Sequence, residues 1–419
     1  MGSVTQARPE PPVLSMVEQA LGIDFGPALG FHPENLRKPV LRIHIQLSRC
    51  ACRATIIIFR VTDSATELGI AEEWLTTFCE ATYTVGSSTP ITHHHHHLQR
   101  QVTALSIQQA LNCLFLTVHY AEKQGSSSGT MPAFEIAQTI RTFGGKLLKL
   151  SHKSAELGGL ETKLNLYLPP QAEKGKVPVL FYLSGLTCTG DNCAEKGNFI
   201  NPASKEGLAL VFPDTSPRGA GAPNEEDSWD FGTGAGFYID ATSDAYAKHY
   251  RMYSYVTKEL PELLFKEFGK ELDESKVGIT GHSMGGHGAL TLFLRNPGKY
   301  KSVSAFSPIV NPINCQWGQK AFSGYFGAEN KSKWSEHDAT ELISSLGDKA
   351  ASLPEILIDQ GLADNFYPDQ LLTKNFEKAA KEAGVKANVR YQDGYDHSYF
   401  FISTFAEEHV KHHAKYLKA

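Results

Sequence analysis

Long apolar runs are absent from this 419-residue sequence. A membrane-spanning helix needs roughly 18 consecutive apolar residues, and segments such as ATIIIF and CLFLTV are far shorter. The N-terminus also lacks a basic start followed by an apolar core, so the sequence predicts no secretory signal. We therefore expect a protein that has no membrane partner.

Cysteine and net charge are also scarce. The seven cysteines are an odd number in a long chain, which favours free thiols in a reducing compartment over a disulfide framework. The net charge is only −5, so no basic field points to nucleic acid. Cys50 and Cys52 lack a second pair at zinc spacing, and the histidine run at positions 93–97 is typical of a low-complexity tract. We predict no metal site.

The basic residues change type along the chain. Residues 1–130 contain 7 Arg and 2 Lys, whereas residues 131–419 contain 5 Arg and 26 Lys. The linker-like stretch KQGSSSGTMP lies at this boundary. We expect residues 1–130 to be an N-terminal extension, disordered or non-native, although residues 41–60 and 111–120 could form strands without clear turn partners. It is either an accessory or targeting region, or translated non-coding sequence with Met131 as the true start. The pattern favours the second explanation.

Residues 131–419 are predicted to form an α/β catalytic domain. The segments LNLYLPP, VPVLFYLSG, LALVFPD, VGITG, SVSAFSP, EILIDQG and ANVRYQD are typical of strands. Helical spacing alternates with them over residues 244–268, 286–295, 370–383 and 398–418, with an interruption expected at Pro261. Such alternation predicts a mostly parallel central sheet flanked by helices.

The stretch GHSMG, residues 281–285, places Ser283 between glycines at a strand-to-helix joint. A turn this tight forces strained backbone angles and close backbone contacts, so small residues must flank the serine. The turn would raise the Ser283 hydroxyl from the carboxyl edge of the sheet, beside the Met284 amide and a helix N-terminus. We predict that Ser283 is a nucleophile.

A serine nucleophile needs a base, and the base in turn needs an acid. Where the serine lies on such a strand-to-helix turn of a parallel sheet, the acid follows it in the sequence and the histidine comes last. His397 follows a predicted strand through a short loop, whereas His337 and the histidines of the C-terminal helix are expected to be exposed. The acid is Asp364, in a loop that can reach the histidine, or Asp359 at the end of a strand; capping or a turn is the structural alternative for Asp359.

The loop FYLSGLTCTGDN follows an early central strand and is expected to supply a second oxyanion donor, the Leu186 amide. Cys188 should lie near the cleft, either beside the site or as an inert thiol. The glycine-rich loop EEDSWDFGTGAGFYID could form the wall of an acyl pocket, with Trp229 as its largest side chain.

Together these segments, with FPDTSPRGAG, SAFSPIVNP and GYDHSYFFISTF, resemble the S-formylglutathione hydrolase (esterase D) family over about residues 131–419. The resemblance implies an α/β-hydrolase fold and hydrolysis of S-formylglutathione, a small-molecule thioester, to formate and glutathione in formaldehyde detoxification. A broad short-chain carboxylesterase is the alternative. The resemblance implies cytoplasmic localisation, no metal or cofactor, and a possible homodimer. It also implies a set of site residues: Ser283 as nucleophile, His397 as base, Asp364 as acid, Leu186 and Met284 as oxyanion amides, and Trp229 and Cys188 beside the substrate.

Overall fold

The computed structural model describes residues 42–49, 55–62 and 132–419, and the chain divides into two units, residues 1–121 and 122–419. In the first unit, β1 (Arg42–Arg49) pairs with β2 (Thr55–Thr62) as an antiparallel ladder. The strands expected at residues 41–60 are therefore present, and each is the other's partner. The predicted strand at 111–120, the histidine run, Cys50 and Cys52 lie outside the described residues.

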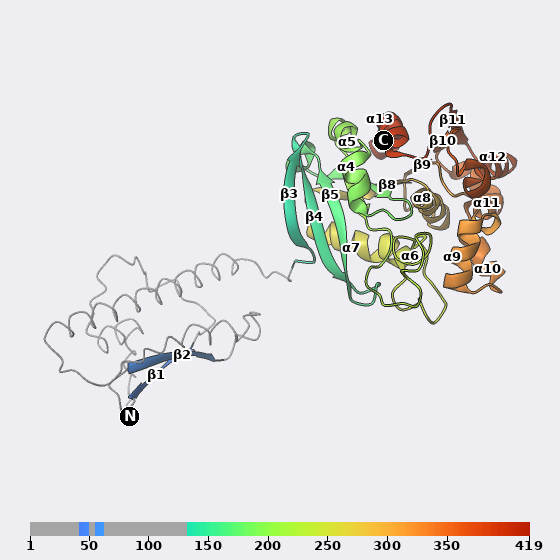
Figure 1. The fold of residues 1–419 in the computed structure, drawn as a ribbon. Helices are drawn as coiled ribbons and strands as arrows, with labels where there is room; N and C mark the ends of the chain where they lie inside the picture. Colours follow the sequence, from blue (N-terminus) through green and yellow to red (C-terminus); the bar gives the residue numbers. More distant parts are fainter. Residues whose placement is uncertain (1–41, 50–54, 63–131) are drawn as a thin grey trace, which may run out of the picture. The chain divides into compact units, whose positions relative to one another are not determined.

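The second unit is built around a nine-stranded sheet with the order β11-β10-β9-β8-β6-β7-β5-β4-β3 (Figure 1). Its strands are β3 (Glu135–Thr142), β4 (Gly145–Ser154), β5 (Leu160–Leu168), β6 (Val177–Leu183), β7 (Ala209–Pro213), β8 (Leu272–Gly281), β9 (Ser302–Phe306), β10 (Ile356–Gly361) and β11 (Ala387–Gln392). Strands β6 to β11 pair in parallel, which confirms the predicted α/β class.

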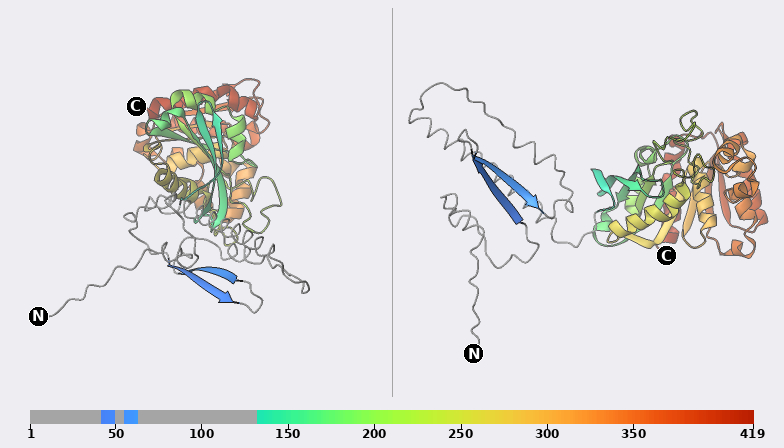
Figure 2. Two further views of the ribbon diagram at one scale, coloured as in Figure 1. Left: turned by 90° about the vertical axis from the view of Figure 1, so that its left-hand side faces the viewer. Right: turned by 90° about the horizontal axis from the view of Figure 1, so that it is seen from below.

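Strands β3, β4 and β5 form an antiparallel end of this sheet. Figure 2, left, looks onto this end. The sequence pattern did not reveal β3 or β4. Every residue of β3 is exposed or half-exposed, so this strand shows no apolar alternation that would mark a buried face.

Helices cover both faces of the sheet (Figure 1). On one face α4 (Gly190–Lys196), α5 (Ile200–Glu206) and α13 (Tyr399–Leu417) share an apolar core with Leu180 and Tyr182 of β6. On the other face α7 (Leu260–Glu267), α8 (Met284–Arg295) and α12 (Thr373–Glu382) share a core with Val179 and Phe181. Alternate residues of one strand therefore face opposite cores, as expected for a sheet covered on both sides.

Shorter elements complete the unit. They are α6 (Met252–Ser254), α9 (Gln316–Phe326), α10 (Lys331–Ser335), α11 (Ala339–Ser344), 3₁₀ turns at Pro170–Glu173, Pro312–Asn314 and Gly347–Ser352, and π turns at Tyr255–Glu259 and Tyr367–Leu371. The helix predicted over 244–268 begins only at Met252, and a π turn directly precedes Pro261 in the first turn of α7. Pro261 thus falls in the first turn of α7, a position where proline is frequent. None of the helices in the described part of the chain is both long and apolar enough to span a bilayer.

Several histidines that were expected to be exposed are buried, which corrects the sequence interpretation. His409 and His413 on α13 are fully buried, and His337 is 3% exposed. The ring of His409 lies 2.8 Å from the Ser304 hydroxyl, and His413 bridges the Ser304 and Ser302 hydroxyls at 2.8 and 2.7 Å. The small serines of β9 leave room for two imidazoles and supply their hydrogen bonds, so α13 docks on the sheet through polar side chains as well as through its apolar core.

These buried histidines predict that the protein loses stability in mild acid. Six buried histidines have lowered pKa values, in each case chiefly because burial disfavours the charged ring; they are His152, His282, His287, His337, His409 and His413. The pKa of His287, for example, falls to about 4. An unfolded histidine titrates near ~6.5. Between the lowered folded value and the unfolded value the unfolded chain binds more protons, so the free energy of unfolding decreases as the pH decreases.

We expect urea unfolding to show a lower free energy of unfolding at about pH 5.5 than at about pH 7.5. His287 and His337, whose pKa values fall to about 4 and about 2, should together account for about 3 kcal/mol of this loss, since each takes up a proton only when unfolded and so contributes about 1.4 kcal/mol across this window. Asp338 acts in the opposite direction, because burial raises its pKa to about 6. A free energy of unfolding that stays constant across this window would contradict the assignment of these histidines as neutral.

Candidate active site

Ser283 lies at the turn between β8 and α8. Its backbone has φ 59° and ψ −119°, a conformation that residues other than glycine rarely adopt. A Cβ on Gly281 would stand 2.2 Å from the Gly285 carbonyl oxygen, and a Cβ on Gly285 would stand 2.0 Å from that of Leu183. Both flanking positions therefore require glycine. The strand, the turn and the helix predicted around Ser283 are present.

His397 and Asp364 meet at the same edge of the sheet. Asp364 follows β10, and His397 lies between β11 and α13. The Nδ1 atom of His397 is 2.5 Å from Oδ2 of Asp364, and Oδ1 of the same carboxylate accepts the Phe366 amide at 2.9 Å. One carboxylate oxygen is thus held by the backbone while the other faces the imidazole.

Asp359 does not contact His397, because its carboxylate binds other side chains. It is completely buried and accepts hydrogen bonds from Arg390 at 2.8 Å, from Gln392 at 2.9 Å and from His409 at 2.9 Å. Burial alone would raise the pKa of Asp359, but the bonds from His409 and Arg390 outweigh it and lower that pKa to about 2. Asp359 is therefore neither the partner of His397 nor a turn cap; it anchors α13 and β11 to β10.

The imidazole of His397 contacts that of His282, the residue before Ser283. Its ring centroid is 4.4 Å from that of His282, and Phe366 meets it edge-on at 5.1 Å. Burial, and then the nearby charge of His397, hold the pKa of His282 well below its usual value. His282 thus stays neutral. In the described residues no hydrogen bond joins the Ser283 hydroxyl to His397, as in many ligand-free active sites where this contact is long.

Two backbone amides close to Ser283 in the chain or in space have no hydrogen-bond partner among the described residues. A Cβ on Gly185 would stand 3.1 Å from Cβ of Ser283, so the loop after β6 lies against the serine. Among the described residues, neither the Leu186 amide nor the Met284 amide donates a backbone or side-chain hydrogen bond, whereas the Thr187 amide donates to Gly234 at 2.9 Å. These free donors are the ones that the sequence analysis selected.

Cys188 and Trp229 lie at different depths. Cys188 is half-buried, and burial raises the pKa of its thiol, which accepts a weak contact from the Tyr399 hydroxyl at 3.9 Å. Trp229 is 53% exposed and packs edge-on against Trp317 at 5.4 Å. Trp317 in turn contacts Phe366 at 4.8 Å, and Phe366 contacts His397. Sequence reasoning missed Trp317 and Phe366. Phe366 lies in the same loop as Asp364, but nothing in that loop shows that its ring meets His397, and no motif marks Trp317.

Other features lie apart from this edge. Within residues 42–49, 55–62 and 132–419, no group of three or more His, Cys, Asp or Glu side chains could hold a metal ion.

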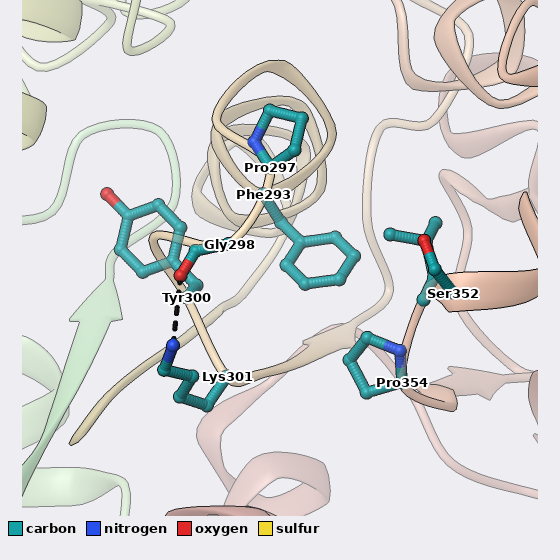
Figure 3. A pocket seen from close by; sticks show the side chains of 8 residues that line it. Phe293, Pro297, Gly298, Tyr300, Lys301, Ser352 and Pro354 are labelled. Carbon is teal, nitrogen blue, oxygen red and sulfur yellow. Dashed lines mark hydrogen bonds between the residues drawn. The ribbon is translucent and has the colours of Figure 1, made fainter. Parts of the chain in front are cut away.

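A pocket of about 420 Å³ is lined by residues at the end of α8 and just before β9 and β10, among them Phe293, Tyr300 and Pro354 (Figure 3). In it the Lys301 ammonium donates to the Gly298 carbonyl at 3.2 Å. It lies at the amino ends of these strands, opposite Ser283, so it is not part of the candidate site.

A strained serine turn between a parallel strand and a helix, with a histidine–aspartate pair at the same sheet edge, defines an α/β-hydrolase. Comparison with known proteins narrows this class. The esterase family model, described as "Putative esterase", matches residues 154–412. The S-formylglutathione hydrolase of Bos taurus is 52% identical over 288 residues, which are 68% of this chain and 100% of the bovine protein. The Arabidopsis thaliana S-formylglutathione hydrolase is 54% identical over 285 residues, 68% of this chain and 98% of the plant protein.

Solved structures agree with these relatives. An S-formylglutathione hydrolase from Agrobacterium tumefaciens superposes with a TM-score of 0.64 at 46% identity, covering 68% of this chain and 99% of that protein. The Staphylococcus aureus serine hydrolase FphF, at 19% identity and a TM-score of 0.51, shares the fold. The chain belongs to the S-formylglutathione hydrolase family.

Proposed function

We propose that this protein hydrolyses S-formylglutathione to formate and glutathione. The observation that carries the proposal is the 2.5 Å contact between His397 and Asp364, at the sheet edge where Ser283 lies against the loop after β6 and the Leu186 and Met284 amides make no hydrogen bond. This arrangement supplies a nucleophile, a base with its orienting acid, and donors for an oxyanion, which are the groups that acyl transfer requires. The names of the bovine, plant and bacterial relatives support the choice of thioester.

In the first half-reaction the Ser283 hydroxyl attacks the formyl carbonyl carbon while His397 takes its proton. The negative charge on the carbonyl oxygen is stabilised by the Leu186 and Met284 amides, and Asp364 stabilises the imidazolium. The C–S bond then breaks, His397 gives its proton to the departing sulfur so that glutathione leaves as the thiol, and a formyl ester is left on Ser283. Water, deprotonated by His397, attacks this ester; formate leaves and the serine regains its proton.

The remaining site residues have supporting roles in this proposal. Cys188 lies two residues beyond Leu186, and its raised pKa keeps it a thiol beside the oxyanion loop rather than a nucleophile. Trp229 forms the outer end of the aromatic row that begins at Phe366 next to His397. It would border the substrate at the mouth of the site.

The test compares turnover of S-formylglutathione with that of p-nitrophenyl acetate. We expect kcat/KM to be much higher for the thioester, because contacts to glutathione contribute binding that the acetate ester cannot make. Equal or reversed values of kcat/KM would instead show a broad short-chain carboxylesterase on the same residues. Failure to turn over either substrate would refute both functions.

We also propose that residues 131–419 form the complete catalytic unit, preceded by an extension at 1–130. The whole sheet of this unit lies within residues 135–392, every proposed catalytic residue lies at or beyond Leu186, and the complete bovine relative aligns with only 288 residues of this chain. A chain that begins at Met131 should match the full chain in kcat/KM and in melting temperature. Insolubility, or a melting temperature lower by more than about 8 °C, would show that the extension stabilises the hydrolase.

Localisation and assembly follow the same family. We propose that the enzyme acts in the cytoplasm as a homodimer. Among the described residues, Cys188, Cys193 and Cys315 are free thiols, which supports a reducing compartment. Light scattering on the purified full chain tests the homodimer, and a monomer at micromolar concentration would contradict it.

A further inference from the structure

The carbonyl of Ser184 occupies a central position in the oxyanion loop. It lies directly after β6 and immediately before the Gly185–Leu186 segment that rests on Ser283. The Tyr238 hydroxyl donates a hydrogen bond to this carbonyl at 2.8 Å, and both residues are completely buried. Burial raises the pKa of Tyr238 well above its ordinary value, so the hydroxyl keeps the proton that it donates.

Tyr238 is held in place by an unusual backbone and by a matching gap in α8. Phe237 and Tyr238 both have positive φ values, 46° and 52°, which non-glycine residues rarely adopt. The Tyr238 ring fills the space left by Gly288, where a Cβ would stand only 2.5 Å from its Cδ2 atom. Strain of this kind persists only where the surroundings enforce it, and it clusters at functional sites. The ring therefore rests on the helix that begins just after the nucleophile.

The rest of the oxyanion loop is fixed from the same side. The Thr187 amide donates to the Gly234 carbonyl at 2.9 Å, and the Thr215 hydroxyl donates to the Cys188 carbonyl at 2.5 Å. Backbone groups on both sides of Leu186 are thus anchored, while its own amide remains free. The Tyr238 hydroxyl is the anchor on the side nearest Ser283.

We propose that Tyr238 is a positioning residue that sets the direction of the Leu186 amide relative to the Met284 amide, an inference that rests on the proposed function. Tyr238 touches no reacting atom. It joins the end of β6 to α8, so that the two oxyanion donors, which come from different elements, keep a fixed separation. Preorganised donors stabilise the transition state because they need no reorganisation when charge develops on the carbonyl oxygen.

The test is the Tyr238→Phe variant, which removes the hydroxyl and keeps the ring over Gly288. Loss of an entire oxyanion donor costs about 10²–10³ in kcat, so a misdirected donor should lower kcat about 10- to 100-fold with KM nearly unchanged. The matched control is Tyr255→Phe. That buried hydroxyl lies 3.1 Å from a ring nitrogen of His152 on β4 and also bonds Thr162 on β5, away from the site, so its loss should leave kcat unchanged.

Two further measurements separate positioning from general stability. A trifluoromethyl ketone analogue forms a hemiketal oxyanion on Ser283, and the Tyr238→Phe variant should bind it more weakly by the same factor as the loss in kcat/KM. Replacement of Tyr238 by 4-aminophenylalanine, which keeps a donor at this position, should restore most of the lost kcat. The Tyr238→Phe protein and the 4-aminophenylalanine protein should have melting temperatures within a few degrees of each other.

The proposal would be overturned if Tyr238→Phe left kcat unchanged or altered only KM. It would also be overturned if Tyr255→Phe lost as much kcat, or if the 4-aminophenylalanine variant did not recover activity. Assays with p-nitrophenyl acetate keep this test independent of the thioester. If the native enzyme cleaves the acetate and not S-formylglutathione, the proposed substrate is wrong while the role of Tyr238 is still measured.

Discussion

Replacing Ser283 with alanine should lower kcat for S-formylglutathione by about four to six orders of magnitude, because no covalent intermediate can then form. The fold should survive. The substitution removes only the hydroxyl, and the strained turn is held by Gly281 and Gly285, whose Cα atoms face backbone oxygens.

A matched control is Ser403→Ala on α13, whose hydroxyl bonds only the helix backbone, at the Phe400 carbonyl 3.1 Å away. It should keep full activity. Circular dichroism and thermal melting establish that both variants are folded. Turnover near the native rate by a folded Ser283→Ala protein would mean that another group attacks the substrate.

The second large effect concerns two aspartates that stand five residues apart. Asp364→Asn should lower kcat by about three to four orders of magnitude, because an amide neither fixes the His397 tautomer nor stabilises its charged form. Stability should change little, since the side chain at 364 faces His397 and one backbone amide.

Asp359→Asn should show the reverse pattern. It removes the charge that Arg390 and His409 share, and breaking a buried pair typically costs about 3–5 kcal/mol of stability. The folded fraction should still turn over substrate at close to the native kcat. Measuring kcat and the urea midpoint for both variants gives the comparison, and a larger kcat loss in Asp359→Asn would show that the acid is wrongly assigned.

The sequence predicted those parts of the site that depend on local backbone geometry. GHSMG between a β-branched strand and an apolar helix leaves few alternatives, because only that turn needs small residues on both sides of a serine. The Leu186 and Met284 amides follow from the same logic, since each stands at the carboxyl end of a central strand. The structure adds that both amides are free of internal partners.

Features that depend on contacts distant in sequence could not be predicted in this way. The residues alone did not decide whether Asp359 or Asp364 is the acid that pairs with His397. The decision depends on which aspartate is bound by Arg390 and His409, which lie on β11 and α13. His409 and His413 were expected on a solvated face of the helix. The sequence EEHVKHH does not show that two serines of β9, distant in sequence, bind these imidazoles. The contact between Tyr238 and Ser184 joins residues 54 positions apart.

Location of the acyl group is the most direct test of the central claim, that Ser283 carries the substrate acyl group during turnover. The full chain is mixed with S-formylglutathione or with p-nitrophenyl acetate, quenched in acid during steady-state turnover, digested, and examined by mass spectrometry. We expect a formyl or acetyl group on the peptide that contains Ser283, and none on the peptide that contains Cys188. An acyl group on Cys188, or on any residue other than Ser283, would contradict that claim.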